Sequence, residues 1–267
     1  MPQETLSTFL QTTLPPLEAF PPPEANNLNT NTTNAAYPPE HITGISRWDD
    51  FDIITILAKY GNVLREVRVP AKRVQTPQPV VSKTVIAHRV TQYMFPRIIT
   101  ALDCAFRYEQ ANNPSTNRTP MTMDVGDMAH YADGFIPALA IYQDGWPDYH
   151  LETRPFNRVP GDVRPSWEWS WDMQNGNESQ QREFRQALSQ VRKYMTDNGR
   201  CRYGFILTDQ ELVATKRNDN SGHTYVSDPI PWSRQGNPKD PVVTPLLALW
   251  YLGMLAANDN GLAAWSF

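Results

Sequence analysis

Residues 178–216 read ESQQREFRQALSQVRKYMTDNGRCRYGFILTDQELVATK, a segment in which a helical repeat is followed by two short apolar runs. Between residues 178 and 198 the apolar side chains recur every three or four positions, which predicts a helix with one buried face. Asn198-Gly199 is a helix stop signal. Residues 202–207 and 211–216 then predict two strands separated by a polar turn. A helix followed at once by a pair of strands indicates an α/β fold.

The flanking sequence extends this α/β pattern in both directions. Residues 48–58 carry apolar side chains at helical spacing, and residues 83–110 form a second helical region that Pro96 must either kink or divide. Residues 135–142 predict a strand that ends at a turn, and residues 244–257 predict a final apolar helix. We therefore expect a central mixed β-sheet flanked by α-helices.

The composition of the N-terminal region differs from that of the rest of the chain. Residues 1–45 hold prolines in clusters and an Asn/Thr tract at residues 26–34, a composition that breaks helices and offers little to bury. We expect an irregular proline-rich arm here, either mobile or packed as extended chain. Residues 46–267 are expected to form a single α/β domain.

Charge and composition exclude several classes of protein. The chain has 24 basic and 28 acidic side chains, so its net charge of -4 makes any contact with nucleic acid a local one. Two cysteines and five scattered histidines are too few for a disulfide framework or a zinc site. No run approaches the roughly 18 apolar residues of a spanning helix, and the start of the chain lacks the pattern of a secretion signal. We expect an intracellular protein, cytoplasmic or nuclear, that contacts no membrane.

Two acidic residues lie where strands are predicted to begin or turn. Asp133 precedes the strand at residues 135–142, and Asp162 lies in a turn beside the next extended segment. Carboxylates that meet at adjacent strand ends can hold Mg²⁺, which prefers oxygen ligands. Gln190 and Tyr194 are four residues apart on the predicted helix, so they share one face and could line a polar cleft with these acids.

Five segments carry a resemblance to a known superfamily: GDVRPSW (161–167), LSQVRKYM (188–195), RYGFILTDQELV (202–213), PIPW (229–232) and LALWYL (247–252). Together they resemble a fungal branch of the PD-(D/E)XK nuclease-like superfamily, over a match that extends from Trp48 to Phe267. The resemblance implies a restriction-endonuclease-like core, in which two strand-borne acids and a lysine form a metal site for Mg²⁺ or Mn²⁺. It also implies a hydrolase that acts on phosphodiester bonds.

The resemblance assigns roles to particular residues. Asp133 stands at the aspartate of the superfamily's Pro-Asp pair, and Asp162-Val163-Arg164 stands at its acid-x-lysine triplet. Gln190 and Tyr194 match the Gln-x-x-x-Tyr element of RecB-like nucleases, and Glu109 matches the helix-borne glutamate. The implied metal ligands are therefore Asp133, Asp162 and Glu109, with Arg164, Gln190 and Tyr194 completing the catalytic set.

Three departures from the superfamily pattern affect the expected chemistry. Ala132 precedes Asp133 where a proline is usual, and Pro137 lies inside a predicted central strand, which it would deprive of a donor. The lysine position holds Arg164, and an arginine stays protonated, so it can neutralise a phosphate but cannot take a proton from water.

Three functions remain open at this stage. The first is a metal-dependent phosphodiesterase with a degenerate site, for which Arg154, Arg158, Arg192, Trp167 and Trp169 are candidate substrate-binding residues. Residues 151–217 hold 11 basic and 9 acidic side chains, a small positive excess that favours a nucleic-acid partner only weakly. The second is a nuclease fold that binds or transforms a small organic molecule without metal, since five tryptophans could line an apolar pocket. The third is an inactive interaction module that uses its proline arm.

Overall fold

The computed structural model describes residues 3–15, 17–18, 20–21, 34–71, 82–114, 118–131, 134–145, 154–197, 201–218, 221–261 and 264–267. Its α-helices are α1 (Leu6–Leu10), α2 (Ile53–Glu66), α3 (Lys83–Tyr93), α4 (Phe95–Asn112), α5 (Glu178–Asp197) and α6 (Pro245–Ala256). Three 3-10 turns accompany them: η3 (Pro39–His41), η4 (Gly126–Met128) and η5 (Trp171–Asn175). Across these ranges, none of the helices has the length and apolar character needed to span a bilayer.

The main sheet is mixed, as the sequence predicts. Its strand order is β2 (Gly44–Arg47), β9 (His223–Val226), β8 (Glu211–Lys216), β7 (Tyr203–Leu207), β6 (Asn157–Val163), β5 (Leu139–Gln143) and β4 (Met121–Val125), and β10 (Ile230–Pro231) also pairs with β8. The pairs β6–β7 and β2–β9 are parallel and the other pairs are antiparallel. A separate two-stranded sheet joins β1 (Gln3–Thr5) to β3 (Arg68–Pro70).

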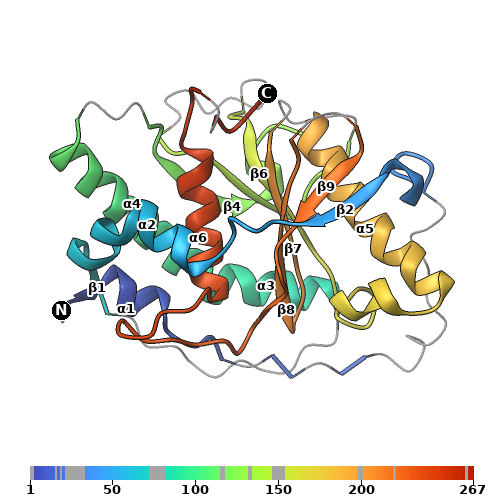
Figure 1. Ribbon diagram of the computed structural model, residues 1–267, viewed down its shortest axis with the longest axis horizontal. Helices are drawn as coiled ribbons and strands as arrows, with labels where there is room; N and C mark the ends of the chain where they lie inside the picture. Colours follow the sequence, from blue (N-terminus) through green and yellow to red (C-terminus); the bar gives the residue numbers. More distant parts are fainter. Residues whose placement is uncertain are drawn as a thin grey trace.

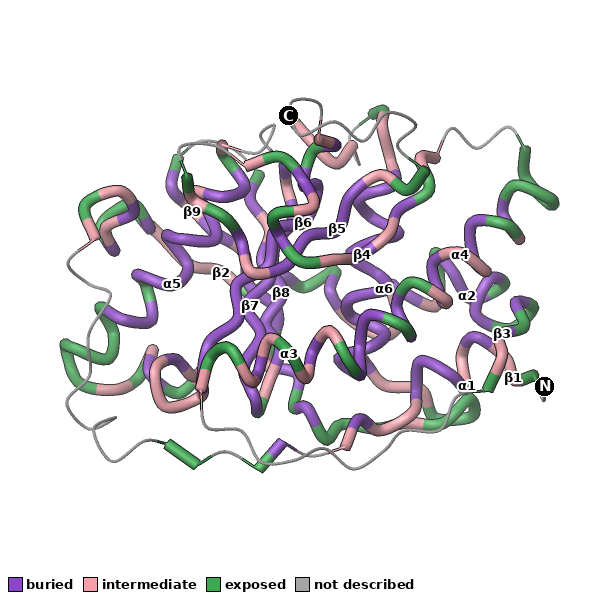
Figure 2. Tube along the Cα trace, turned by 180° about the vertical axis from the view of Figure 1, so that it is seen from behind, coloured by how far each residue is buried: buried purple, intermediate pink, exposed green. Residues whose placement is uncertain are grey.

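Helices cover both faces of the main sheet, and the alternation of side chains along the central strands shows why. On β7, Phe205 and Leu207 lie in the core shared with α2, α4 and α6, whereas Ile206 packs in the core shared with α5. Successive side chains of a strand point to opposite faces, so a strand that is apolar throughout needs cover on both. Figure 1 shows α5 on one side of the sheet and α2, α4 and α6 on the other, and Figure 2 shows β7 and β8 buried between them.

Several predicted elements are confirmed with shifted boundaries. Pro96 divides the helical region at residues 83–110, because it lies in the first turn of α4. A proline is tolerated there, since the backbone N–H groups of a first turn have no partner within the helix. The first predicted helix starts later than its apolar pattern suggests, because Asp52 accepts a bond from Thr55 N at 2.9 Å and caps α2. Strand β5 begins only at Leu139, so Pro137 lies before the strand and removes no ladder donor.

The structure differs from the expected N-terminal arm over residues 3–15. Leu6, Phe9 and Leu10 have no exposed surface and belong to the main core, and β1 pairs with β3. Thr244 Oγ1 donates to the carbonyl of Leu10 at 2.6 Å, which ties α1 to the start of α6. The helix α1 lies before the first proline cluster, Pro15-Pro16, so its short apolar run is free to form a buried helix. Most of the predicted Asn/Thr tract lies outside the described residues.

Candidate functional site

The end of strand β6 places an acid and a base side by side. Asp162 and Arg164 are two residues apart, so they lie on the same face of the chain, while Val159 and Val163 point into the opposite core. Arg164 Nε donates to Asp162 Oδ2 at 2.7 Å, and the backbone N–H of Arg164 donates to the carbonyl of Leu207 at 2.9 Å. Asp162 is 1% exposed and Arg164 2%, so this ion pair is inside the protein.

Helix α5 completes the pair on the same face of the sheet. Arg164 Nη2 donates to Gln190 Oε1, and Gln190 Nε2 donates to the hydroxyl of Tyr194. Gln190 and Tyr194 are one turn apart on α5 and both are buried. The four residues that the resemblance assigns to the strand and helix motifs therefore form one hydrogen-bonded chain.

A lysine that the sequence analysis does not single out reaches the same carboxylate from another helix. Lys83 opens α3, and its Nζ donates to Asp162 Oδ1 at 3.4 Å. Its side chain is 46% exposed, in contrast to the buried acid that it contacts. Both oxygens of Asp162 thus face a cation. The five residues Lys83, Asp162, Arg164, Gln190 and Tyr194 are called the Asp162 cluster below.

The ionisation of the cluster follows from its burial and its charges. Burial alone would raise the pKa of Asp162, but the Arg164 guanidinium and the Lys83 ammonium together outweigh it and hold that pKa below its ordinary value. For Arg164, burial opposes the charged form and the Asp162 carboxylate overcomes it, so the pKa is raised. Burial also raises the pKa of the Tyr194 phenol, and the nearby Asp162 carboxylate adds to this effect. At pH 7 the site thus holds the negatively charged Asp162 carboxylate, the positively charged Arg164 guanidinium and the neutral Tyr194 phenol.

The segment at residues 34–41 lies over α5 and brings a second tyrosine to the cluster. Gln186 Nε2 donates to the carbonyl of Tyr37 at 2.6 Å, and the Tyr37 ring meets Phe135 edge-on at 5.9 Å between centroids. Burial raises the pKa of the Tyr37 phenol, while Arg164 opposes the shift, which places the phenol within electrostatic reach of the cluster. Tyr37 therefore lies near the cluster, held by Gln186 of α5 and by Phe135.

The donor set of the described residues does not fit Mg²⁺ or Mn²⁺ as it stands. Asp162 is the only carboxylate of the cluster, and its two oxygens are held by two cations. Within the described ranges, no group of three or more His, Cys, Asp or Glu side chains is arranged to hold a metal ion. Asp133, the second acid that the sequence predicts as a ligand, lies outside the described residues.

Glu109 occupies a different environment from the Asp162 cluster. Arg118 Nη1 donates to both of its carboxylate oxygens, at 3.0 and 3.2 Å, and the two residues line a separate cavity of about 180 Å³. Burial raises the pKa of Glu109, and the Arg118 guanidinium opposes this shift. The predicted third metal ligand is therefore not brought into contact with Asp162.

The predicted basic rim is also dispersed. Arg158 is buried, donates to Asp259 Oδ1 at 2.7 Å and lies 4.7 Å from the centroid of the Trp265 ring. Arg154 lies over the Tyr131 ring at 5.1 Å. Arg158 and Arg154 therefore contact other side chains of the protein, namely Asp259, Trp265 and Tyr131. Arg192 lines the cavity described below.

The two tryptophans predicted to bind substrate have different surroundings. Trp169 has no exposed surface and stacks on Phe184 at 5.5 Å between ring centroids. Its Nε1 donates to the carbonyl of Phe184 at 3.3 Å, so it fills the core under α5. Trp167 lies in the turn after β6 and is partly exposed. Trp169 is therefore closed to a ligand, whereas Trp167 has side-chain surface open to solvent.

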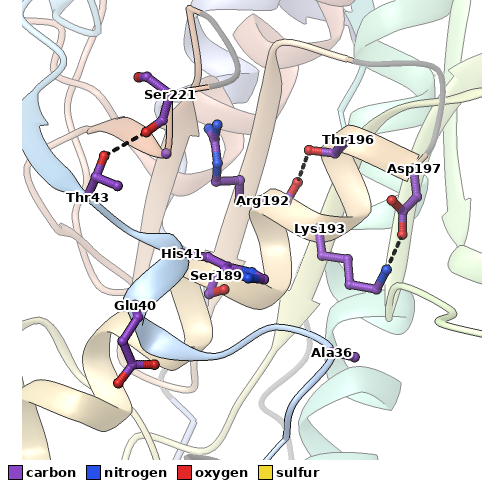
Figure 3. Close-up of a pocket in the computed structure, with 11 residues that line it drawn as sticks. Ala36, Glu40, His41, Thr43, Ser189, Arg192, Lys193, Thr196, Asp197 and Ser221 are labelled. Atoms are coloured by element: carbon purple, nitrogen blue, oxygen red, sulfur yellow. Dashed lines mark hydrogen bonds and ion pairs between the residues drawn. The ribbon is translucent and has the colours of Figure 1, made fainter.

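A cavity of about 560 Å³ lies between α5 and the N-terminal segment, and none of the five residues of the Asp162 cluster lines it (Figure 3). Ala36, Glu40, His41 and Thr43 line it from the N-terminal segment, and Ser189, Arg192, Lys193, Thr196 and Asp197 line it from α5. Lys193 Nζ donates to Asp197 Oδ2 at 2.7 Å within this wall. Most of its described lining residues carry polar or charged side chains and none of them is a tryptophan, unlike the tryptophan-lined pocket that the small-molecule alternative predicts.

Sequence reasoning missed Lys83 and Tyr37 because nothing in their local pattern sets them apart. Lys83 follows a helix-capping serine in an ordinary first turn, and Tyr37 precedes a Pro-Pro pair in the predicted arm. Both residues reach the cluster only through long-range packing.

Comparison of the chain with protein-family models, with curated proteins and with solved structures finds no match.

Proposed function

We propose that this chain is a nuclease-like protein of the PD-(D/E)XK kind, with a restriction-endonuclease-like core and a degenerate active site, that acts on or binds phosphodiesters at the Asp162 cluster. One observation carries the proposal. Asp162 and Arg164 on β6 and Gln190 and Tyr194 on α5, which the resemblance assigns to one site, form one continuous hydrogen-bonded chain. A mixed sheet flanked by helices on both faces also supports it.

The chemistry of the cluster suits a phosphodiester. An anionic phosphate oxygen is attracted by the Arg164 guanidinium and the Lys83 ammonium, and in a site of low dielectric such charges act more strongly than in water. The neutral Tyr194 phenol can donate a hydrogen bond to an oxygen. Hydrolysis would need an activated water, and Arg164 cannot take its proton. We therefore propose metal-dependent hydrolysis only if a second carboxylate binds the metal together with Asp162, and Asp133 is the candidate for it.

The test uses the full-length protein, bis(p-nitrophenyl) phosphate as a simple phosphodiester and a fluorescein-labelled DNA duplex. We expect the protein to bind the duplex in EDTA, because the described residues of the cluster offer cations to a phosphate but no metal site. The double variant Asp162→Asn/Arg164→Gln should lose this binding, and it removes the ion pair without leaving one buried charge alone. Cleavage with Mg²⁺ or Mn²⁺, and metal binding in calorimetry, are expected only if Asp133 joins Asp162 as a second carboxylate. Absence of metal binding at millimolar concentration, together with absence of cleavage and of DNA binding, would contradict the proposal.

A second candidate function is favoured by the cavity of about 560 Å³ beside α5. Its volume lies within the range of about 300 to 1,000 Å³ that small-molecule sites occupy. In this reading the nuclease-like fold binds or transforms a small polar organic molecule without metal. DNA binding and thermal melting distinguish the two candidates. If the protein does not bind DNA but a polar ligand of metabolite size raises its melting temperature, the second candidate is favoured.

A further inference from the structure

We propose that Lys83, and not Arg164, is the cation of the Asp162 cluster that binds the phosphate group of the substrate. This inference rests on the proposed function and assigns a specific substrate-binding residue to it. It differs from the expectation from sequence, in which the arginine after the strand acid neutralises the phosphate.

The hydrogen bonds of Arg164 already commit its guanidinium to the protein. Its Nε donates to Asp162, its Nη2 donates to Gln190, and its side chain is 2% exposed. Breaking one of these bonds to reach a ligand would leave a buried polar group without a partner, which is unfavourable. Arg164 therefore acts as a positioning residue that holds Asp162 against α5.

Lys83 can contact an anion that approaches from solvent, whereas the buried Arg164 cannot. Its side chain is 46% exposed and its contact with Asp162 Oδ1, at 3.4 Å, is longer than the 2.7 Å contact of Arg164 with Asp162 Oδ2. An ammonium has three N–H donors on a flexible stem, so one donor can stay on Asp162 while another meets an anionic oxygen from solvent. Among the five residues of the cluster, Lys83 is the one that extends from the buried carboxylate to the surface.

The charge balance favours an anion at this point. Of the side chains in direct contact around Asp162, one carboxylate faces two cations, which leaves an excess of one positive charge. Arg164 makes the shorter contact with Asp162, at 2.7 Å against 3.4 Å for Lys83, so an anion that approaches from solvent meets the excess positive charge at the half-exposed Lys83. The first turn of α3 also contains no acidic residue that would compete for it.

The experiment measures binding of the labelled DNA duplex by fluorescence anisotropy at several NaCl concentrations, in EDTA, with the full-length protein. We expect Lys83→Met to weaken binding about fivefold or more and to reduce the slope of log K against log[salt] by about 0.9, the value for one lost phosphate contact. Lys83→Arg keeps the charge and should retain most of the affinity. Lys239→Met, which removes the same charge from an exposed turn, is the matched control and should change neither quantity by more than about twofold.

The failures of the two proposals are distinguishable. If wild type binds the duplex and Asp162→Asn/Arg164→Gln loses that binding, but Lys83→Met keeps wild-type affinity and slope, the role of Lys83 is wrong and the proposed function stands. If wild type neither binds nor cleaves a phosphodiester, both proposals fall. Circular dichroism and thermal melting of each variant check that a lost signal does not come from unfolding. Because Lys83 is half-exposed and Arg164 remains on Asp162, we expect Lys83→Met to fold.

Discussion

At the scale of single residues, Arg164 shows how one guanidinium can join a strand to a helix. A planar guanidinium donates in two directions at once, and Arg164 uses this geometry to join Asp162 on the strand to Gln190 on the helix. A lysine has a single nitrogen and could not hold both partners in the same way. Arg164 thus connects β6 to α5, and the amine of the cluster comes from Lys83.

The buried acid makes stability depend on pH in a specific direction. The pKa of Asp162 is lower in the folded protein than in the unfolded chain, so its contribution is present above the ordinary value of about 4 and is lost as the pH falls toward the folded value. At pH 7, Asp162→Asn should lower the free energy of unfolding by about 3–5 kcal/mol, because the buried Arg164 loses its counter-charge.

Urea denaturation between pH 7 and pH 3 checks this prediction. The difference between wild type and Asp162→Asn should be constant near neutral pH and should narrow below about pH 4, where the unfolded wild-type chain binds a proton. Asp49→Asn, at a carboxylate that is 84% exposed, should change stability by less than about 0.5 kcal/mol throughout. A difference that stays the same down to pH 3 would contradict the ionisation described here.

At the scale of elements, the contact between β6 and β7 explains the glycine that precedes Asp162. Gly161 pairs with Phe205 across the parallel ladder, and the Phe205 ring lies against the position that a side chain at residue 161 would occupy. A Cβ at this position would fall within 3.0 Å of three ring carbons. The glycine therefore lets β6 pass close to the ring, which fixes the position of the next residue, Asp162.

The substitution Gly161→Ala tests this contact. We expect it to lower the free energy of unfolding by about 1–3 kcal/mol, because the ring or the strand must move to admit the methyl group. Phe205→Leu removes the ring, so the effect of Gly161→Ala in that background should be smaller, and a double-mutant cycle measured by urea denaturation gives the coupling. Additive effects would mean that the methyl group does not meet the ring.

At the scale of the whole molecule, the N-terminal residues are part of the core. Leu6, Phe9 and Leu10 are fully buried, and Gln11 Nε2 donates to the carbonyl of Val242 at 2.8 Å. Part of the predicted arm at residues 1–45 therefore belongs to the same core as the predicted domain at residues 46–267. Strand β2 also draws residues 44–47 into the main sheet beside β9.

A chain limited to residues 46–267 should not fold as the full protein does. This shortened chain lacks α1, so apolar surface of α2 and α6 becomes exposed. We expect the shortened chain to lose the cooperative unfolding transition of the full chain, as measured by near-UV circular dichroism. A milder variant, Leu10→Ala, should cost about 2–5 kcal/mol. Ile54→Ala, at a residue 78% exposed, is the control and should cost about 0.5 kcal/mol or less. Cooperative unfolding of the shortened chain with unchanged stability would restore the division into two parts.

Local pattern predicts the elements of this fold well, because helix periodicity, caps and breakers act over a few residues. The spacing of apolar side chains is enough to place α5, β7 and β8, and Pro96 is enough to separate α3 from α4. The same local information predicts that Gln190 and Tyr194 share a face of one helix. It wrongly places Asp162 in a turn, because the glycine before it is a turn signal, whereas Asp162 lies inside β6.

Long-range packing determines which of these side chains meet. Lys83 is 79 residues from Asp162 in the chain, Gln186 is 149 from Tyr37, and Thr244 is 234 from Leu10, yet each pair is joined by a hydrogen bond. No local pattern contains such pairings, because they follow from how the sheet orders its strands and which helix covers each face. For the same reason Glu109, Arg158 and Trp169, which have the expected residue types, lie in other contacts, whereas a lysine from an ordinary helix start lies against the buried acid.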